Sequence, residues 1–227
     1  RAEYHANLGN LLRREGRMAE AEETYREALT LEPTHKTAGL GLARTLKDLG
    51  QHRASEAQCR KLIALDARNA EPWSALGAAL RDQLRPEEAE AAYRRAVAVQ
   101  PNYATAHHNL GALLSEMERA EEALAILDRA GSLGVKSREL LINRARTLFK
   151  LYRFDEAERV YEEAVTLDPL DPEAQQSLAE LRYMRGDPKF ARNIVAAAAS
   201  RRDNLRLQLL FGDLLRRFRD RANLTQE

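Results

Sequence analysis

The 227-residue chain has a single cysteine and no long apolar segment, and its charges nearly cancel. Cys59 has no second cysteine to pair with, which excludes an internal disulfide and fits a reducing compartment. No apolar run approaches the roughly 20 residues of a membrane-spanning helix. A net charge of +1 argues against a basic surface spread over the whole molecule, as binding to nucleic acid or an anionic membrane would need. We therefore expect a cytoplasmic protein that binds no membrane.

The chain also lacks the residue patterns that carry chemistry. His107 and His108 are adjacent, whereas two histidines that bind one metal ion from a helix are four residues apart. The other three histidines lie elsewhere in the chain and are not close to one another in the sequence. Each glycine has a place in a turn or at a helix contact, so none is left for a phosphate-binding loop. We predict no catalytic residue, no metal site and no cofactor in this chain.

What the chain does have is one pattern that recurs at a step of 34 residues. The clearest copy consists of Trp73, Leu76, Gly77, Leu80, Ala89, Tyr93, Ala96 and Pro101. Two periods earlier the same pattern consists of Leu8, Gly9, Leu12, Ala21, Tyr25, Ala28 and Pro33. A fixed period of this length predicts stacked structural units, each of which buries its apolar face against its neighbours.

Each copy predicts two helices. From Trp73 to Leu80 the apolar and small residues recur at i, i+3, i+4 and i+7, which places them on one face of a helix. From Ala89 to Ala96 they do the same on a second helix, and we expect Gly77 to face Ala89 where the two helices meet. Glycines mark several of the turns between the helices, and prolines close the second helix.

This pattern resembles the tetratricopeptide (TPR) repeat over nearly the whole chain. The resemblance implies an all-α fold, a right-handed α-solenoid superhelix of antiparallel helix-turn-helix units. We expect one array over residues 1–227, with units at about 2–35, 36–69, 70–103, 104–137, 138–171 and 172–204 and a partial seventh at 205–227. The second unit departs most from the pattern, with Gly39 in the tryptophan place and Leu62 for a small residue. Cys59 replaces its tyrosine, so we expect a small buried residue there rather than a nucleophile.

In TPR proteins the first helices of successive units line a concave groove, in which partners usually lie as extended or helical peptides. The resemblance therefore implies a set of peptide-binding residues on the open face of each first helix. They are Asn7, Asn10, Arg13, Arg44, Lys47, Arg81, His108, Asn109, Asn143, Arg146 and Phe149. The basic residues of the first three units favour an acidic partner. Two other interpretations stay open: Arg and Glu side chains pair with each other on a solvated face, and the asparagines bond neighbouring groups or water.

The leading hypothesis is an adaptor that binds a protein or peptide and catalyses no reaction. The alternative is the substrate-recruiting region of a larger enzyme of the glycosyltransferase, sulfotransferase or 2-oxoglutarate/iron oxygenase type, which the reading frame beyond Glu227 would decide. RNA binding ranks last, because the groove rows lack the regularity of a one-base-per-repeat code. We do not expect nucleic acid as the partner.

The two ends of the chain lead to further expectations. The sequence opens at Arg1 without an initiator methionine and stops at Glu227 inside a repeat, so we expect a piece of a longer protein. The partial seventh repeat would expose apolar residues such as Leu214 and Phe218, which favours self-association through this C-terminal helix. Most of the basic residues are arginine, a bias that indicates a bacterial source.

Overall fold

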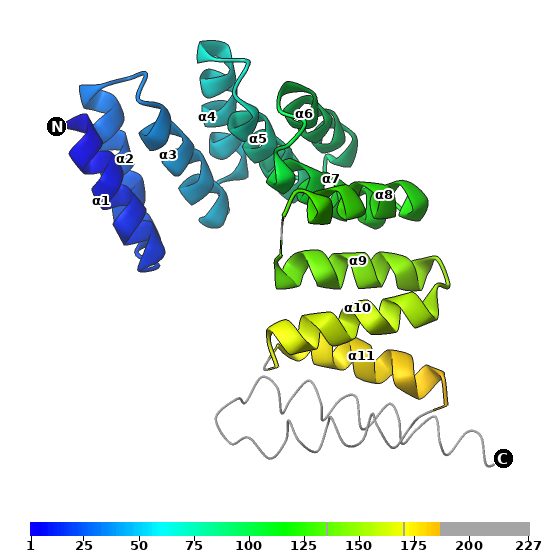
Figure 1. Cartoon of the computed structure of the whole chain (residues 1–227). Helices are drawn as coiled ribbons and strands as arrows, with labels where there is room; N and C mark the ends of the chain where they lie inside the picture. The colour runs from blue at the N-terminus through cyan, green and yellow to red at the C-terminus, as the bar shows by residue number, and fades with distance from the viewer. Residues whose placement is uncertain (135, 170, 187–227) are drawn as a thin grey trace. The chain divides into compact units, whose positions relative to one another are not determined.

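A computed structural model describes residues 1–134, 136–169 and 171–186 of the chain. Within these residues the protein is entirely α-helical, with eleven helices and no strand (Figure 1). In chain order the helices are α1 (Ala2–Arg14), α2 (Met18–Leu31), α3 (Lys36–Asp48), α4 (His52–Leu65), α5 (Ala70–Asp82), α6 (Pro86–Val99), α7 (Ala104–Glu116), α8 (Ala120–Ser132), α9 (Arg138–Lys150), α10 (Phe154–Leu167) and α11 (Pro172–Met184). The predicted all-α fold is confirmed.

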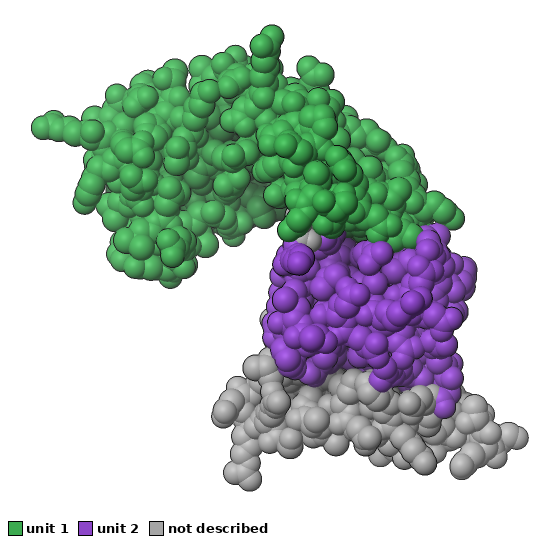
Figure 2. All heavy atoms as spheres, viewed as in Figure 1, with its two compact units in different colours: residues 1–135 green, residues 136–227 purple. Residues whose placement is uncertain are grey.

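The chain divides into two compact units, residues 1–135 and 136–227, which Figure 2 draws in different colours. The first contains α1 to α8, which pack as four consecutive helix hairpins. The described part of the second contains the hairpin of α9 and α10, with α11 packed against α10. A single array over residues 1–227 stays a prediction. The second helix of the sixth repeat, the partial seventh repeat and its expected self-association lie outside the described residues.

The turn between the two helices of a repeat contains one residue in the left-handed region. Gly16 and Gly50, predicted as turn residues, have φ angles of 78° and 74°. One, two and three periods after Gly50, the same place is taken by Leu84, Glu118 and Tyr152, with φ angles of 59° to 60°. Only glycine adopts this conformation without steric cost, so these three turns are held by the packing of the helices on either side.

The first helix of several repeats begins with a side chain that caps its free N–H groups. Asn69 Oδ1 accepts a hydrogen bond from the Glu71 N–H at 3.0 Å, and Ser137 Oγ accepts one from the Leu140 N–H at 3.1 Å. Such caps satisfy backbone donors that have no partner within the helix. Tyr103 stands at the same repeat position before α7 and makes no such bond. The position therefore tolerates a large side chain that does not cap.

Small residues set the distance between the two helices of a repeat, as predicted. A Cβ atom added to Gly77 would lie 2.6 Å from the ring of Tyr93, and Ala89 is fully buried in the same core cluster as Tyr93. The ring of Tyr25 also reaches the following repeat, since a Cβ on Gly41 would lie 2.4 Å from it. These tyrosines therefore join one repeat to the next, and the glycines leave room for them.

The second repeat reaches the same packing with different residues. The side chain of Leu62 takes up the space beside Gly39, where an added Cβ would lie 2.7 Å from Leu62 Cδ2. Cys59 is fully buried, as predicted, and burial raises the pKa of its thiol to about 12. A thiol that stays protonated at neutral pH acts as a small apolar group and not as a nucleophile. Trp73, expected in the core, is only partly buried and donates a hydrogen bond from Nε1 to the Ala67 carbonyl at 3.1 Å.

Candidate functional site

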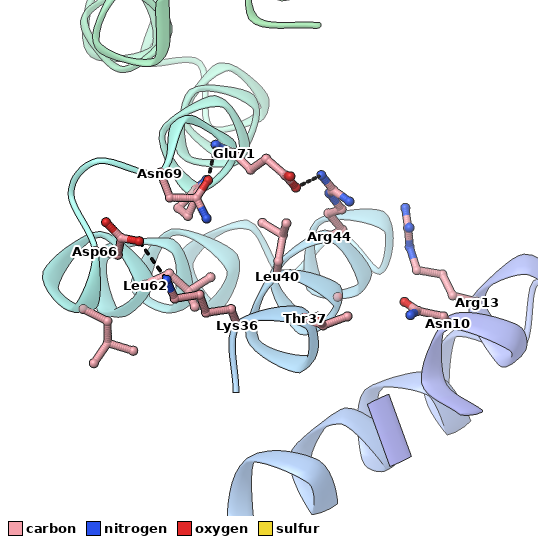
Figure 3. Close-up of a pocket in the computed structure, with 13 residues that line it drawn as sticks. Asn10, Arg13, Lys36, Thr37, Leu40, Arg44, Leu62, Asp66, Asn69 and Glu71 are labelled. Atoms are coloured by element: carbon pink, nitrogen blue, oxygen red, sulfur yellow. Dashed lines mark hydrogen bonds and ion pairs between the residues drawn. The ribbon is translucent and has the colours of Figure 1, made fainter. Parts of the chain in front are cut away.

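The first helices of the four repeats in unit 1, α1, α3, α5 and α7, border two adjoining hollows. The first hollow has a volume of about 350 Å³ and lies between α1, α3, the end of α4 and the start of α5 (Figure 3). The second, of about 240 Å³, receives side chains from all four first helices. Arg13, Arg44 and Glu71 line both. The two hollows therefore form a continuous depression along this part of the chain.

The wall of the first hollow combines apolar and charged side chains. Leu40, Leu62 and Leu65 provide its apolar part. Lys36 Nζ lies 2.8 Å from Asp66 Oδ2, and a second ion pair, between Arg44 and Glu71, spans α3 and α5 (Figure 3). A concave surface that combines apolar area with a few fixed polar groups is typical of a binding site.

Each basic residue predicted for unit 1 has a carboxylate beside it. Arg13 reaches Asp48 of the next repeat at 3.0 Å, and Arg44 reaches Glu71 at 3.0 Å. The remaining contacts, each within 4.0 Å, are Lys47 with Asp48 and Asp82, and Arg81 with Asp82 and Glu116. The interpretation in which Arg and acidic residues of this face pair with each other thus describes the geometry. Such partly exposed pairs contribute little net stability, so a partner's carboxylate can exchange with them at small cost.

The asparagines of unit 1 also bond to neighbouring groups. Asn7 Nδ2 donates to Glu3 at 3.3 Å, and Asn109 Nδ2 donates to Ser74 Oγ at 3.3 Å. Asn10 Oδ1 accepts a hydrogen bond of 2.7 Å from the Tyr25 hydroxyl, whose pKa is raised by burial. The amide groups of Asn10 and Asn109 keep further donor or acceptor capacity toward the hollows that they line.

The structure brings five of the eight residues predicted in unit 1 to the hollows. They are Asn10, Arg13, Arg44, Lys47 and Asn109. Asn7, Arg81 and His108 lie on α1, α5 and α7 outside the walls of these two hollows. Whether any of the eight contacts a partner stays a prediction.

Asn143, Arg146 and Phe149 all lie on α9 of unit 2. Arg146 pairs with Glu173 of α11. The ring of Phe149 packs edge-on against Phe154 at a centroid distance of 5.4 Å, and Phe154 packs in turn against Tyr152. Sequence reasoning found Phe149 but not the other two rings, because they belong to the turn and to the start of the second helix.

Sequence reasoning also missed most of the apolar wall of the first hollow. Leu62 and Leu65 lie on α4, the second helix of the repeat, and Asn69 precedes α5, whereas the predicted groove residues all lie on first helices. A signal was present nonetheless, since Asn69 stands one period before Tyr103. Where one repeat has a smaller side chain than the next repeat has at the same position, the volume of the larger side chain can remain unfilled.

Two other kinds of site, a metal-binding cluster and a membrane-spanning helix, are absent from the part of the chain that the structure describes. No three His, Cys, Asp or Glu side chains there are gathered closely enough to hold a metal ion. No helix among the described residues is both long and apolar enough to cross a membrane.

Comparison with known families accounts for the repeat. Models of the tetratricopeptide repeat match residues 12–80 and 138–181, and a TPR repeat model matches residues 85–117. The chain belongs to the tetratricopeptide repeat family. The eleven described helices correspond to five to six TPR units, packed as the sequential antiparallel pairs of a TPR solenoid. TPR domains typically mediate protein–protein interactions.

Solved structures show the same fold. TTC0263, a thermophilic TPR protein of Thermus thermophilus, is 24% identical with a TM-score of 0.70, over 81% of this chain and 100% of that one. PilF of Pseudomonas aeruginosa is 19% identical with a TM-score of 0.78, over 95% and 97%. YrrB, a TPR protein described as having an unusual peptide-binding site, is 20% identical with a TM-score of 0.57, over 78% and 91%. A separate comparison with curated proteins found no match.

Proposed function

We propose that this TPR protein is an adaptor that holds a segment of another protein in the depression along α1, α3, α5 and α7, here called the groove. In this proposal the chain itself catalyses no reaction. The observation that supports it most is the presence of side chains from all four first helices around one hollow, which adjoins a second and larger one. Because such a surface is already formed in the free protein, little conformational entropy is lost when the partner binds. YrrB, which has the same fold and is described as having an unusual peptide-binding site, supports peptide binding as a function of this fold but not a particular mode of binding.

The charges of the groove favour a partner segment that carries acidic residues. Arg44 is central to this, because it lines both hollows and pairs across the surface with Glu71 of the next first helix. A carboxylate of the partner would take the place of Glu71 or share the guanidinium with it, since arginine offers five N–H donors in a fixed arrangement. Lys47 supplies a second positive charge one helical turn further along α3.

Two alanines of unit 1 provide a matched test of the groove. Ala78 on α5 lines the second hollow, whereas Ala91 on α6 is exposed and lines neither hollow. Peptides are first selected on the wild-type chain from a random phage-displayed library, and their dissociation constants are then measured on both variants. We expect Ala78→Arg to weaken binding at least about tenfold, a loss of about 1.4 kcal/mol. Ala91→Arg adds the same side chain and should leave binding unchanged. Equal affinities for the two variants would place the binding site elsewhere.

The sign of the groove charge is tested with the same peptides. Arg44→Glu combined with Lys47→Glu should abolish the binding of acidic peptides, while helicity stays as in the wild type and the melting temperature falls only slightly, because the new carboxylates lie beside Glu71, Asp48 and Asp82 on a partly exposed surface. Because both side chains are partly exposed, the reversal should not disturb the core. If the dissociation constants of acidic peptides do not change, these two cations are not part of the binding site.

A further inference from the structure

Asn69 and Tyr103 stand one period apart, at the same place in two consecutive repeats. Each precedes a first helix, Asn69 before α5 and Tyr103 before α7. Asn69 lines the first hollow and Tyr103 lines the second. The hollow of about 350 Å³ therefore has the short side chain at this repeat position, and the hollow of about 240 Å³ has the aromatic ring.

The residues around Tyr103 show which kind of side chain fits at this repeat position. Its side chain packs against a cluster formed by Ala70, Ala96 and Ala106. Burial raises the pKa of its phenol, the Glu71 carboxylate raises it further, and the Arg44 guanidinium acts in the opposite direction. The partly buried ring thus packs against apolar groups, while charged groups lie near its hydroxyl. The apolar groups suit the ring of a tyrosine, and the charged groups suit its polar hydroxyl.

The same set of positions surrounds the first hollow. Six residues lie close to Tyr103: the three alanines of the cluster, and Arg44, Glu71 and Thr105 near the hydroxyl. One period earlier, the counterparts of all six line the first hollow, and they are Lys36, Leu62, Pro72, Asn10, Thr37 and Glu71. Figure 3 labels Lys36, Leu62, Asn10, Thr37 and Glu71 on the walls of this hollow, together with Asn69. The first hollow is therefore the site of Tyr103 repeated one period earlier, without the ring, and we call it the empty socket.

We propose that the empty socket binds an aromatic side chain, a tyrosine by the chemistry of its walls, from a partner segment that lies in the groove. This inference rests on the proposed groove function and adds an anchor residue to it. Leu62 and Pro72 supply apolar surface for the ring. Thr37 and Glu71 lie where the hydroxyl, which both donates and accepts hydrogen bonds, would be placed. A buried aromatic anchor of this kind carries a large share of the affinity of an interface.

The first test uses a single side chain as the probe. N-acetyl-L-tyrosinamide is titrated into the isotope-labelled chain, and the amide resonances of Thr37, Leu65, Asn69 and Glu71 are followed by NMR. We expect saturable shifts with a millimolar dissociation constant, as is usual for so small a ligand. N-acetyl-L-leucinamide, which lacks the ring and the hydroxyl, should bind at least about tenfold more weakly. Equal affinities of the two probes, or shifts that lie elsewhere in the chain, would overturn the proposal.

Three variants then test whether the socket itself is responsible. Asn69→Tyr fills the socket with the side chain that the next repeat has, and should weaken N-acetyl-L-tyrosinamide binding at least about tenfold. Asn69→Ser keeps a cap for α5 and leaves the socket open, so its affinity should equal that of the wild type. Ser137→Tyr removes a cap and adds a tyrosine at the same repeat position in unit 2, and should also leave the affinity unchanged. Undiminished binding to Asn69→Tyr would contradict the socket.

The library-selected peptides distinguish two negative results: that the socket binds no aromatic residue, and that the groove binds no peptide at all. We expect an aromatic residue at one common position among them and at least about tenfold weaker binding to Asn69→Tyr. Peptides that are weakened by Ala78→Arg but not by Asn69→Tyr would overturn the socket and leave the groove in place. Peptides that are unaffected by Ala78→Arg would overturn the groove itself.

Discussion

The second repeat, residues 36–69, and the third, residues 70–103, form the same pair of helices from different side chains. The third has Trp73, Tyr93 and Tyr103, whereas the second has Gly39, Cys59 and Asn69 at the corresponding places. Three aromatic rings are therefore missing from the second repeat. Because a packed interior has little spare volume, the space of each missing ring must be filled by other atoms or left open.

Two of the three missing rings are compensated within the second repeat. Leu62 replaces the small Ala96 of the third repeat and fills the space beside Gly39. Ala43 stands where the third repeat has Gly77, and it is buried in the same core cluster as Cys59. Side-chain volume that is missing from one helix of the second repeat is thus provided by a larger side chain on its other helix. The repeat conserves the volume at the helix contact and not the identity of the residues that provide it.

The third missing ring is not compensated. Asn69 leaves the first hollow open, although the same place in the third repeat is closed by Tyr103. Positions where a chain departs from its own packing rule without compensation are frequent at functional sites. The comparison therefore separates substitutions that preserve the fold from the one that creates a candidate binding site.

The largest expected difference between the two repeats is at the buried tyrosine position. Tyr93→Ala should lower the free energy of unfolding by about 3–5 kcal/mol, because it leaves a cavity between two repeats. Cys59→Ala removes a single buried sulfur and should cost only about 1 kcal/mol. Urea denaturation followed by circular dichroism measures both. Similar losses at the two positions would show that the second repeat is not packed around smaller side chains.

A double-mutant cycle can convert the contact of the third repeat into that of the second. Gly77→Ala alone should cost about 1–3 kcal/mol, since the new Cβ would lie 2.6 Å from the ring of Tyr93. In the background of Tyr93→Cys the same change should be much less harmful, with a coupling energy of at least about 0.5 kcal/mol. The free energies of unfolding of the four proteins give this coupling. Strict additivity would mean that the two helices do not compensate each other's volume.

The smallest expected effect concerns the turns, where the second repeat has Gly50 and the third has Leu84, both with positive φ. Leu84→Gly should raise the free energy of unfolding by about 0.5–1 kcal/mol, because the leucine pays a steric cost in this conformation and its side chain is exposed. Gly50→Leu should lower it by about 1–2 kcal/mol. Thermal melting of the two variants gives the comparison. A loss of stability in Leu84→Gly would show that Leu84 makes a contribution other than its backbone conformation.

Much of the fold could be predicted from residue spacing. The 34-residue period located the helix pairs, the buried small residues Gly77 and Ala89, and the prolines that follow the second helices. The left-handed residue of the third turn was not identified, because Leu84 has no intrinsic preference for that conformation and is held there by tertiary packing. The exposure of Trp73 was also misjudged, since periodicity places a residue on a helix face but not at a depth.

For the candidate site, the sequence placed Arg13, Arg44 and Lys47 on one face, and the structure brings them to the hollows. Pairing of these cations with acidic residues was one of the open interpretations, but the particular partners, Asp48 and Glu71 among them, were not predicted, because long flexible side chains reach partners on neighbouring helices only once those helices are packed. The sequence by itself determined the repeat, the helix pairs and the family, since these depend on local spacing that recurs along the chain. Only the tertiary structure decided where a hollow remains, because such a space is the small difference between the room that several segments enclose and the volume of the side chains that fill it.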